Sequence, residues 1–197
     1  MGAALRQLAI LTFVTLDGVM QAPSVPEEDT SGGFAHGGWA RPYWDDVMAQ
    51  VMREAMAEPY DLLLGRTTYD LFASTFSNAS AANPVATKLN EATKYVVTST
   101  NNTLVWQNSN RISGDISTAV RRLKTQDGPL LQVHGSWQLL QTLVANELVD
   151  EFRLWTFPVV VGSGKRLFGD GNPLSSLSLA KTEATPGGAV MTIYRRA

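Results

Sequence analysis

Two hydrophobic patterns alternate along the chain: short apolar runs, and segments whose apolar residues recur every three or four positions. The first pattern predicts buried strands and the second predicts amphipathic helices. The predicted strands are residues 8–14, 60–64, 94–97, 130–133 and 150–157. The predicted helices are residues 45–56, a segment that begins near Thr67, and residues 85–91, 115–124 and 137–145. Residues 177–185 and 189–196, joined at Pro186, Gly187 and Gly188, predict a C-terminal β-hairpin.

Strands that alternate with helices are typical of an α/β protein with a largely parallel sheet, and the closing hairpin makes the expected sheet mixed. The chain has 197 residues and is 44% hydrophobic, which is enough for one sizeable core. We therefore expect a single domain over residues 1–197. Residues 22–42 and 74–86 have no periodic pattern, so we expect two loops there that carry specificity.

Composition narrows the chemistry. The formal charge is −2 and no basic block is present, so nucleic acid is not an expected partner. The absence of cysteine excludes disulfides and thiolate catalysis, and two isolated histidines, His36 and His134, predict no metal site. No apolar run reaches the length of a membrane span, and no targeting segment is evident, so we expect a cytoplasmic protein without a membrane partner.

Polar motifs follow three of the predicted strands. They are Gly65-Arg66-Thr67-Thr68, Thr98-Ser99-Thr100 and Gly135-Ser136-Trp137-Gln138. Gly65 allows a positive φ or a close approach to a ligand, and Thr67 or Thr68 can cap the helix that follows. The carboxyl ends of parallel strands meet at one edge of a sheet, where helix N-termini and an arginine favour a phosphate. The motifs together predict a site for a phosphorylated nucleotide, although the Rossmann and Walker A fingerprints are absent.

Two further groups are candidates for contact with a substrate. Trp39 and Trp44 border the loop 22–42, where they either anchor the loop to the core or stack on a substrate. Asp17 follows the first strand and either orders the turn or contacts a ligand. A lone histidine at a strand end, such as His134, is more often structural than catalytic.

These motifs, with Thr15-Leu16-Asp17-Gly18 near the N-terminus and Pro158-Val159-Val160-Val161-Gly162-Ser163-Gly164, resemble the dihydrofolate-reductase-like superfamily in order and spacing. The chain is most similar to the branch that contains the reductase domain of the bifunctional riboflavin-biosynthesis deaminase-reductase. The resemblance implies a three-layer α/β/α fold and an NADPH-dependent oxidoreductase.

Site residues follow from the resemblance. It places Arg66, Thr98 and Ser99 on the adenosine 2′-phosphate of NADPH. It places the helix starts at Thr67 and at Gly135 on the pyrophosphate, and the segment from Val14 to Met20 beside the nicotinamide. Thr100, Ser136, Trp137 and Gln138 complete the expected cofactor-binding set. A homodimer, built by the C-terminal hairpin, is a further implication of the resemblance.

The expected activity is hydride transfer to a small carbonyl, imine or pteridine-like substrate, similar to 5-amino-6-(5-phosphoribosylamino)uracil reductase. The chain departs from folate reductases, because the carboxylate expected on the first helix falls near Ala49. Asp45, about one turn earlier, is the candidate proton donor or substrate anchor, and its alternative role is to favour the helix N-terminus. Dihydrofolate reductase activity and a non-catalytic nucleotide-binding module are the alternative functions.

Overall fold

The computed structural model describes residues 5–80, 82–169, 172–173 and 175–197, and within them eight strands form one sheet in the order β4-β3-β2-β5-β1-β6-β8-β7. The strands are β1 (Leu8–Thr15), β2 (Tyr60–Gly65), β3 (Lys94–Val97), β4 (Ser109–Ile112), β5 (Leu130–His134), β6 (Glu151–Phe157), β7 (Leu177–Ala184) and β8 (Val190–Arg196). The pairs from β4 to β6 are parallel, whereas β6–β8 and β8–β7 are antiparallel. The predicted mixed, mostly parallel sheet with a C-terminal hairpin is confirmed.

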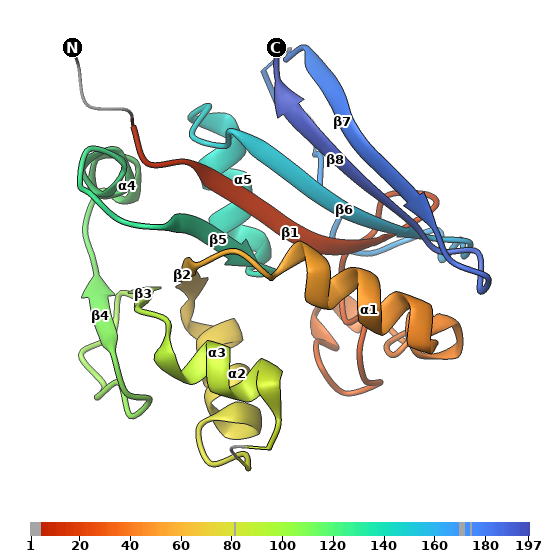
Figure 1. Cartoon of the computed structure of the whole chain (residues 1–197), viewed down its shortest axis with the longest axis horizontal. Helices are drawn as coiled ribbons and strands as arrows, with labels where there is room; N and C mark the ends of the chain where they lie inside the picture. The colour runs from red at the N-terminus through yellow and green to blue at the C-terminus, as the bar shows by residue number, and fades with distance from the viewer. Residues whose placement is uncertain (1–4, 81, 170–171, 174) are drawn as a thin grey trace.

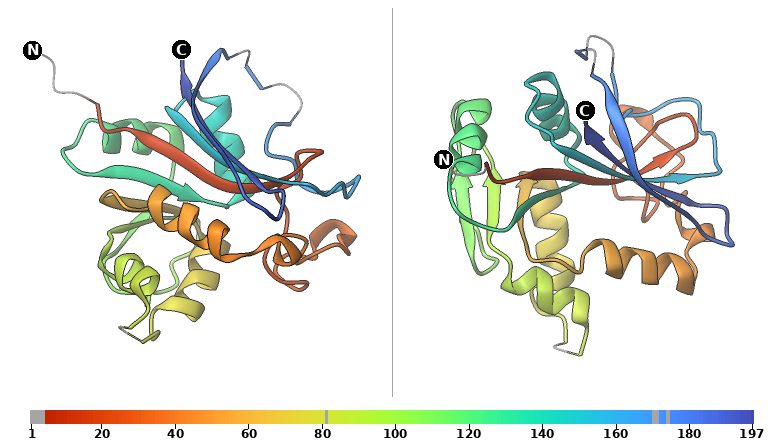
Figure 2. Two further views of the ribbon diagram at one scale, coloured as in Figure 1. Left: turned by 45° about the vertical axis from the view of Figure 1, so that its right-hand side comes forward. Right: turned by 45° about the horizontal axis from the view of Figure 1, so that its top comes forward.

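Helices cover both faces of the sheet (Figure 1). They are α1 (Asp46–Ala55), α2 (Arg66–Phe76), α3 (Pro84–Glu91), α4 (Ile116–Lys124) and α5 (Trp137–Ala145), with short 3-10 turns at Ser31–Gly33 and Arg41–Tyr43. Alternation along the strands divides the core in two. In β2, Leu62 and Leu64 pack with α1, α2 and α3, whereas Leu63 packs with α4 and α5. The right-hand view in Figure 2 separates these helix layers, so the predicted α/β/α arrangement is confirmed.

Three local predictions were wrong. Strand β4 was not predicted, because its sequence Ser-Asn-Arg-Ile has one buried position and no apolar run. Helix α2 continues to Phe76 and α3 begins at Pro84, so the loop expected over residues 74–86 is shorter. Neither threonine caps α2: the N-cap is Gly65, Arg66 is the first helical residue, and no side chain caps this helix.

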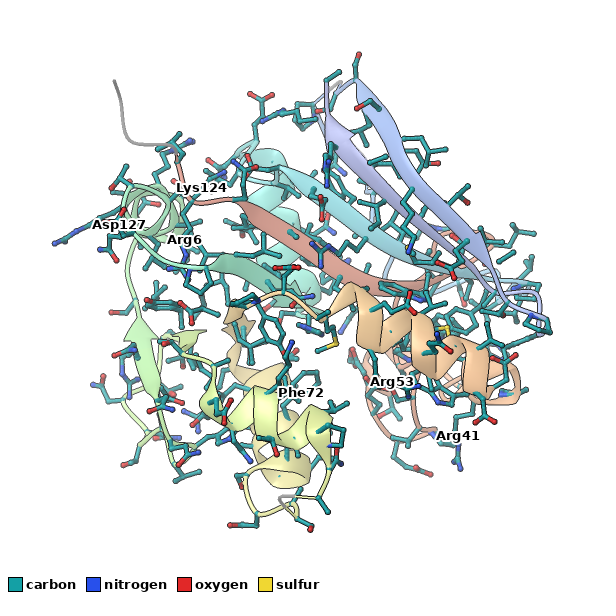
Figure 3. The ribbon with its side chains drawn as sticks, in the orientation of Figure 1. Arg6, Arg41, Arg53, Phe72, Lys124 and Asp127 are labelled. Atoms are coloured by element: carbon teal, nitrogen blue, oxygen red, sulfur yellow. The ribbon has the colours of Figure 1, made fainter. Side chains whose placement is uncertain are left out.

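Ion pairs hold the amino ends of the strands together near α4. Arg6, almost fully buried before β1, pairs with Asp61 of β2, and Lys124 of α4 pairs with Asp150 at 2.5 Å (Figure 3). The charged side chains at the amino ends are therefore paired with one another, and the glycine- and hydroxyl-rich motifs lie at the opposite, carboxyl ends of the strands.

Across the described ranges, every helix is too short or too polar to cross a membrane.

Candidate functional site

The carboxyl ends of β2 and β5 lie side by side and bring the starts of α2 and α5 together. The Gly65 N–H donates to Ser136 Oγ at 2.8 Å, and Ser136 Oγ donates to Thr68 Oγ1 at 2.8 Å. We call these three residues, Gly65, Thr68 and Ser136, the α2–α5 junction. Because each helix N-terminus carries a partial positive charge, the junction concentrates two such ends at one point of the sheet edge.

The junction depends on an unusual backbone conformation. Ser136 has φ +64°, in the left-handed region that side chains disfavour, and its neighbour Gly135 has φ +54°. The two hydrogen bonds of Ser136 Oγ hold this conformation. Gly65 has φ −73°, so the first of the two alternatives expected for this glycine, a positive φ, does not hold. The glycine is required instead for close approach, since an added Cβ would lie 3.1 Å from Ser136 Cβ.

Beyond the junction, two arginines converge on one carbonyl oxygen. Arg66 Nε contacts both carboxylate oxygens of Asp70, at 2.9 and 2.8 Å, and its Nη1 donates to the Asn102 carbonyl at 3.4 Å. Arg111 Nη2, from β4, donates to the same carbonyl at 2.7 Å. The pair carries two positive charges, of which the Asp70 ion pair offsets one. This edge of the sheet is therefore suited to a phosphate group.

The remaining sequence-predicted cofactor residues lie along the same edge. Thr98 is buried, and its Oγ1 contacts Thr100 Oγ1 at 3.1 Å and accepts from the Thr100 N–H at 3.2 Å. Ser99, Thr67 and Gln138 are exposed at the strand and helix ends. Trp137 instead faces the segment after β6, where its Nε1 donates to the Arg166 carbonyl at 2.9 Å.

Arg111 is the residue of this edge that sequence reasoning missed. It lies on β4, the strand that the apolar pattern did not reveal. The sequence feature that could have indicated this residue is a basic side chain downstream of the hydroxyl-rich segment 98–100.

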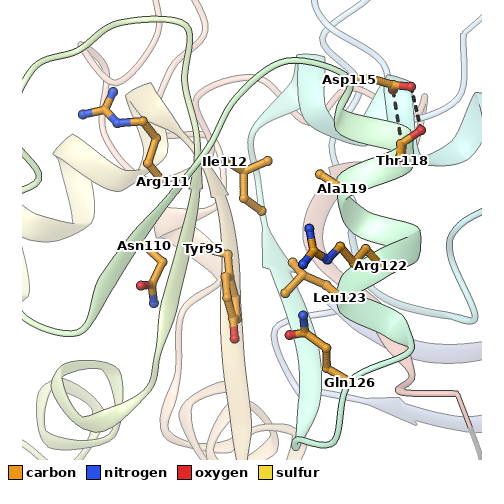
Figure 4. A pocket seen from close by; sticks show the side chains of 10 residues that line it. All are labelled: Tyr95, Asn110, Arg111, Ile112, Asp115, Thr118, Ala119, Arg122, Leu123 and Gln126. Atoms are coloured by element: carbon orange, nitrogen blue, oxygen red, sulfur yellow. Dashed lines mark hydrogen bonds between the residues drawn. The ribbon is translucent and has the colours of Figure 1, made fainter.

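A cavity of about 600 Å³ lies beside this edge, between β3–β4 and α4 (Figure 4). Tyr95 and Ile112 of the sheet and Arg122 and Leu123 of α4 line it. In Figure 4 the Arg111 side chain points away from Tyr95 and Arg122. Arg111 also lines the cavity, but its guanidinium donates to the Asn102 carbonyl of the strand-end site.

The segment expected beside the nicotinamide is built around Asp17. Its carboxylate accepts from Thr15 Oγ1 at 2.6 Å and from the Gly162 N–H at 2.9 Å. The Thr15 hydrogen bond is the main cause that lowers the pKa of Asp17 below its usual value. These contacts order the turn, which is one of the two roles expected of Asp17. Val14 and Met20 are both buried in the core that contains α5.

The three other candidate residues differ in their freedom to meet a ligand. Asp45 is the N-cap of α1: it accepts from the Met48 N–H at 2.7 Å and from the Gly187 N–H at 3.3 Å. Trp39 is buried, and its Nε1 donates to the Gln21 carbonyl at 2.7 Å, so it anchors the loop 22–42. Trp44 is 49% exposed and meets Phe13 edge-on at 6.0 Å, which leaves much of its ring accessible.

A set of buried polar groups lies on the face of the sheet that α1 and α2 share. The side-chain amide nitrogen and oxygen of Gln132, in β5, have no hydrogen-bond partner among the described residues. The same holds for His134 Nε2 and for the Tyr60 hydroxyl. The His134 ring lies 5.8 Å from Phe72 of α2 and 6.5 Å from Tyr60. Burial, and secondarily the charge of Arg153, lower the pKa of His134 to about 4. His134 is thus a neutral imidazole near pH 7. Unpaired buried polar groups call for water or a ligand.

Comparison with known proteins shows the family of the chain. Residues 6–191 match the protein family described as the RibD C-terminal domain. The uncharacterized protein YyaP of Bacillus subtilis (strain 168) is 30% identical over 136 residues, which are 68% of this chain and 72% of the relative.

Solved structures share the fold, and two of them are similar to nearly the whole of this chain. A putative riboflavin biosynthesis protein from Shewanella sp. PV-4 superposes with a TM-score of 0.65 and 18% identity, covering 97% of this chain and 99% of that one. A pyrimidine reductase-like protein from Corynebacterium diphtheriae NCTC superposes with a TM-score of 0.59 and 11% identity, covering 98% of this chain and 92% of that one. The resemblance expected from the sequence motifs is confirmed.

Proposed function

Because the chain belongs to the RibD C-terminal domain family, we propose that it is an NADPH-dependent reductase. The substrate that we propose is a small carbonyl, imine or pteridine-like compound, similar to that of 5-amino-6-(5-phosphoribosylamino)uracil reductase. The observation that carries the proposal is the convergence of Arg66 and Arg111 on the Asn102 carbonyl, next to the paired starts of α2 and α5.

The residues at this edge fit a phosphorylated dinucleotide. A 2′-phosphate needs a cation beside it, and the arginine pair has one positive charge left after Asp70 is counted. Ser99 adds an exposed hydroxyl group at the end of β3, where Thr98 carries a second, buried one. No side chain caps α2 or α5, so the first turns of these two helices offer backbone N–H groups that suit a pyrophosphate.

When bound, NADPH supplies a hydride from its nicotinamide ring. The chain itself would bind the substrate on the face shared by α1 and α2, where the unpaired groups of Gln132 and His134 can take up its polar atoms. His134 is neutral and Asp45 is engaged as a helix cap. We therefore assign the proton to water, with Asp45 retained as the side-chain candidate.

The test is calorimetric titration of the wild-type protein with NADPH and, in parallel, with NADH. Arg66→Ala should weaken NADPH by about 10- to 100-fold, the range for a lost charge-assisted contact, and NADH by much less. Arg122→Ala removes the same charge from α4, where the side chain faces Tyr95, and is the matched control (Figure 4). Equal losses for both nucleotides, or no binding of either one, would refute the proposal.

Turnover separates the alternatives. NADPH oxidation with a ribosylaminopyrimidine or with dihydrofolate would distinguish the two reductase activities. Nucleotide binding without oxidation of NADPH by any carbonyl or pterin substrate would instead support the non-catalytic binding module.

A further inference from the structure

Tyr69 of α2 is fully buried, one helical turn after Arg66. Its hydroxyl accepts from the Trp106 backbone N–H at 2.8 Å and from Ser109 Oγ at 3.3 Å. Its ring lies 6.0 Å from the Trp106 ring and 5.9 Å from the Arg66 guanidinium carbon. A single side chain on α2 thus reaches the arginine, the β3–β4 connection and the first residue of β4.

The β3–β4 connection, residues 98–108, contains neither helix nor strand. Backbone hydrogen bonds hold its two ends, at Thr98 and Asn108, and between them its position depends on side-chain contacts. Most of its residues are exposed, but Trp106 is 2% exposed and fixes its far end. Besides the Tyr69 contact, Trp106 Nε1 donates to Asn90 Oδ1 at 2.5 Å, and Lys94 Nζ lies 4.4 Å from its ring. Within this anchored segment lies Asn102, whose carbonyl accepts from both arginines.

Two guanidinium groups repel one another, so they share one carbonyl oxygen only if that oxygen is held in place. The Tyr69 hydroxyl supplies this restraint twice, because it bonds the connection at Trp106 and the start of β4 at Ser109. Arg111 is on the same short strand as Ser109. Pairing with β3 fixes Arg111 in the sheet, and the Tyr69 hydroxyl ties that strand and the connection to α2, the helix that carries Arg66.

We propose that Tyr69 is a positioning residue that gives this protein its selectivity for nucleotides with a 2′-phosphate, by docking the β3–β4 connection so that Arg66 and Arg111 converge. The inference rests on the proposed function, since it assumes that the arginine pair binds the 2′-phosphate of NADPH. It adds one requirement to the proposed function: a hydroxyl group that does not contact the nucleotide must hold both arginines in position.

The experiment compares Tyr69→Phe with Tyr60→Phe. Both remove one hydroxyl from a buried tyrosine, but the Tyr60 hydroxyl has no partner among the described residues. For each protein, the affinities for NADPH and NADH are measured by calorimetry, and amide hydrogen exchange is followed in residues 98–108. Ser109→Ala, which removes the longer of the two contacts, is a milder variant should Tyr69→Phe fold poorly.

Tyr69→Phe should weaken NADPH by about five- to tenfold, as expected for a lost hydrogen bond, and leave NADH within about twofold. Exchange in residues 98–108 should accelerate in this variant and not in Tyr60→Phe. Ser109→Ala should shift NADPH affinity in the same direction by a smaller factor.

Two outcomes would overturn the inference alone: unchanged NADPH selectivity in both Tyr69→Phe and Ser109→Ala, or equal losses in Tyr69→Phe and Tyr60→Phe. Failure of the wild-type protein to bind NADPH would overturn the proposed function and this inference together.

Discussion

The close approach of α2 and α5 predicts an interaction between two substitutions that lie far apart in the sequence. A Cβ on Gly65 would lie 3.1 Å from Ser136 Cβ and 3.2 Å from Ser136 Oγ, tighter than nine in ten real Cβ contacts. Without the contact, Gly65→Ala should raise the free energy of unfolding by about 0.4–1 kcal/mol, because alanine lowers the conformational entropy of the unfolded chain and φ −73° suits alanine in the folded one. Overpacking against Ser136 should cost about 1–3 kcal/mol. The expected net effect is destabilisation.

Ser136→Gly removes both atoms that the new methyl group would meet. In that background the steric cost disappears, and Gly65→Ala should raise the free energy of unfolding by about 0.4–1 kcal/mol. The same substitution therefore changes sign between the two backgrounds. The coupling free energy should equal the overpacking cost, about 1–3 kcal/mol.

Urea unfolding of the wild-type protein, the two single variants and the double variant measures this coupling, provided that the four m-values agree. Gly169→Ala is the matched control, because the nearest atom to its new methyl group is the end of the Gln141 side chain, at 3.4 Å. It should have the same effect with and without Ser136→Gly. Equal effects of Gly65→Ala in both backgrounds would refute the steric account of the junction.

Three further predictions concern the other candidate residues. Asp45→Ala should lower the free energy of unfolding by about 1 kcal/mol through loss of the α1 cap, whereas Asp45→Asn should keep the cap; turnover by Asp45→Asn at the wild-type rate would exclude Asp45 as proton donor. The pKa of His134 is about 4 in the folded protein and about 6.5 in the unfolded chain, so the unfolded chain binds more protons between these two pH values. The free energy of unfolding should therefore fall by up to about 3 kcal/mol as the pH drops from 6.5 to 4. His134→Gln should remove this part of the slope in pH-dependent denaturation and exposed His36→Gln should not. Trp44→Ala should raise the KM for substrate and leave the NADPH affinity unchanged; an unchanged KM would restrict Trp44 to packing on Phe13.

The hydrophobic pattern predicted most of the fold because most strands and helices bury apolar residues that form a run or a regular repeat in the sequence. Leu62 and Leu64 of β2 are fully buried, and runs of that kind are legible without knowledge of their neighbours. Strand β4 is the exception. It lies at the sheet edge with three of its four residues at least partly exposed, so pairing with β3 rather than burial creates it.

The candidate site was only partly predictable for a related reason. Strand ends with glycine and hydroxyl groups indicated a phosphate site, but the sequence does not contain the order of strands. That β5 lies between β2 and β1 is what brings Ser136 against Gly65. Arg111 was missed together with its strand, and the role of Tyr69 depends on contacts with a connection that has no periodic pattern.

For the hydride transfer that we propose, strand β5 carries residues of both parts of the site. His134 is the last residue of β5, and its side chain lies on the α2 side of the sheet beside Phe72. Ser136 follows across one glycine and joins the N-termini of α2 and α5. A cofactor bound at the junction and a substrate bound over Gln132 and His134 would therefore meet at the end of β5. A change of substrate can then be accommodated by residues upstream of Gly135, without disturbing the junction that we assign to the cofactor.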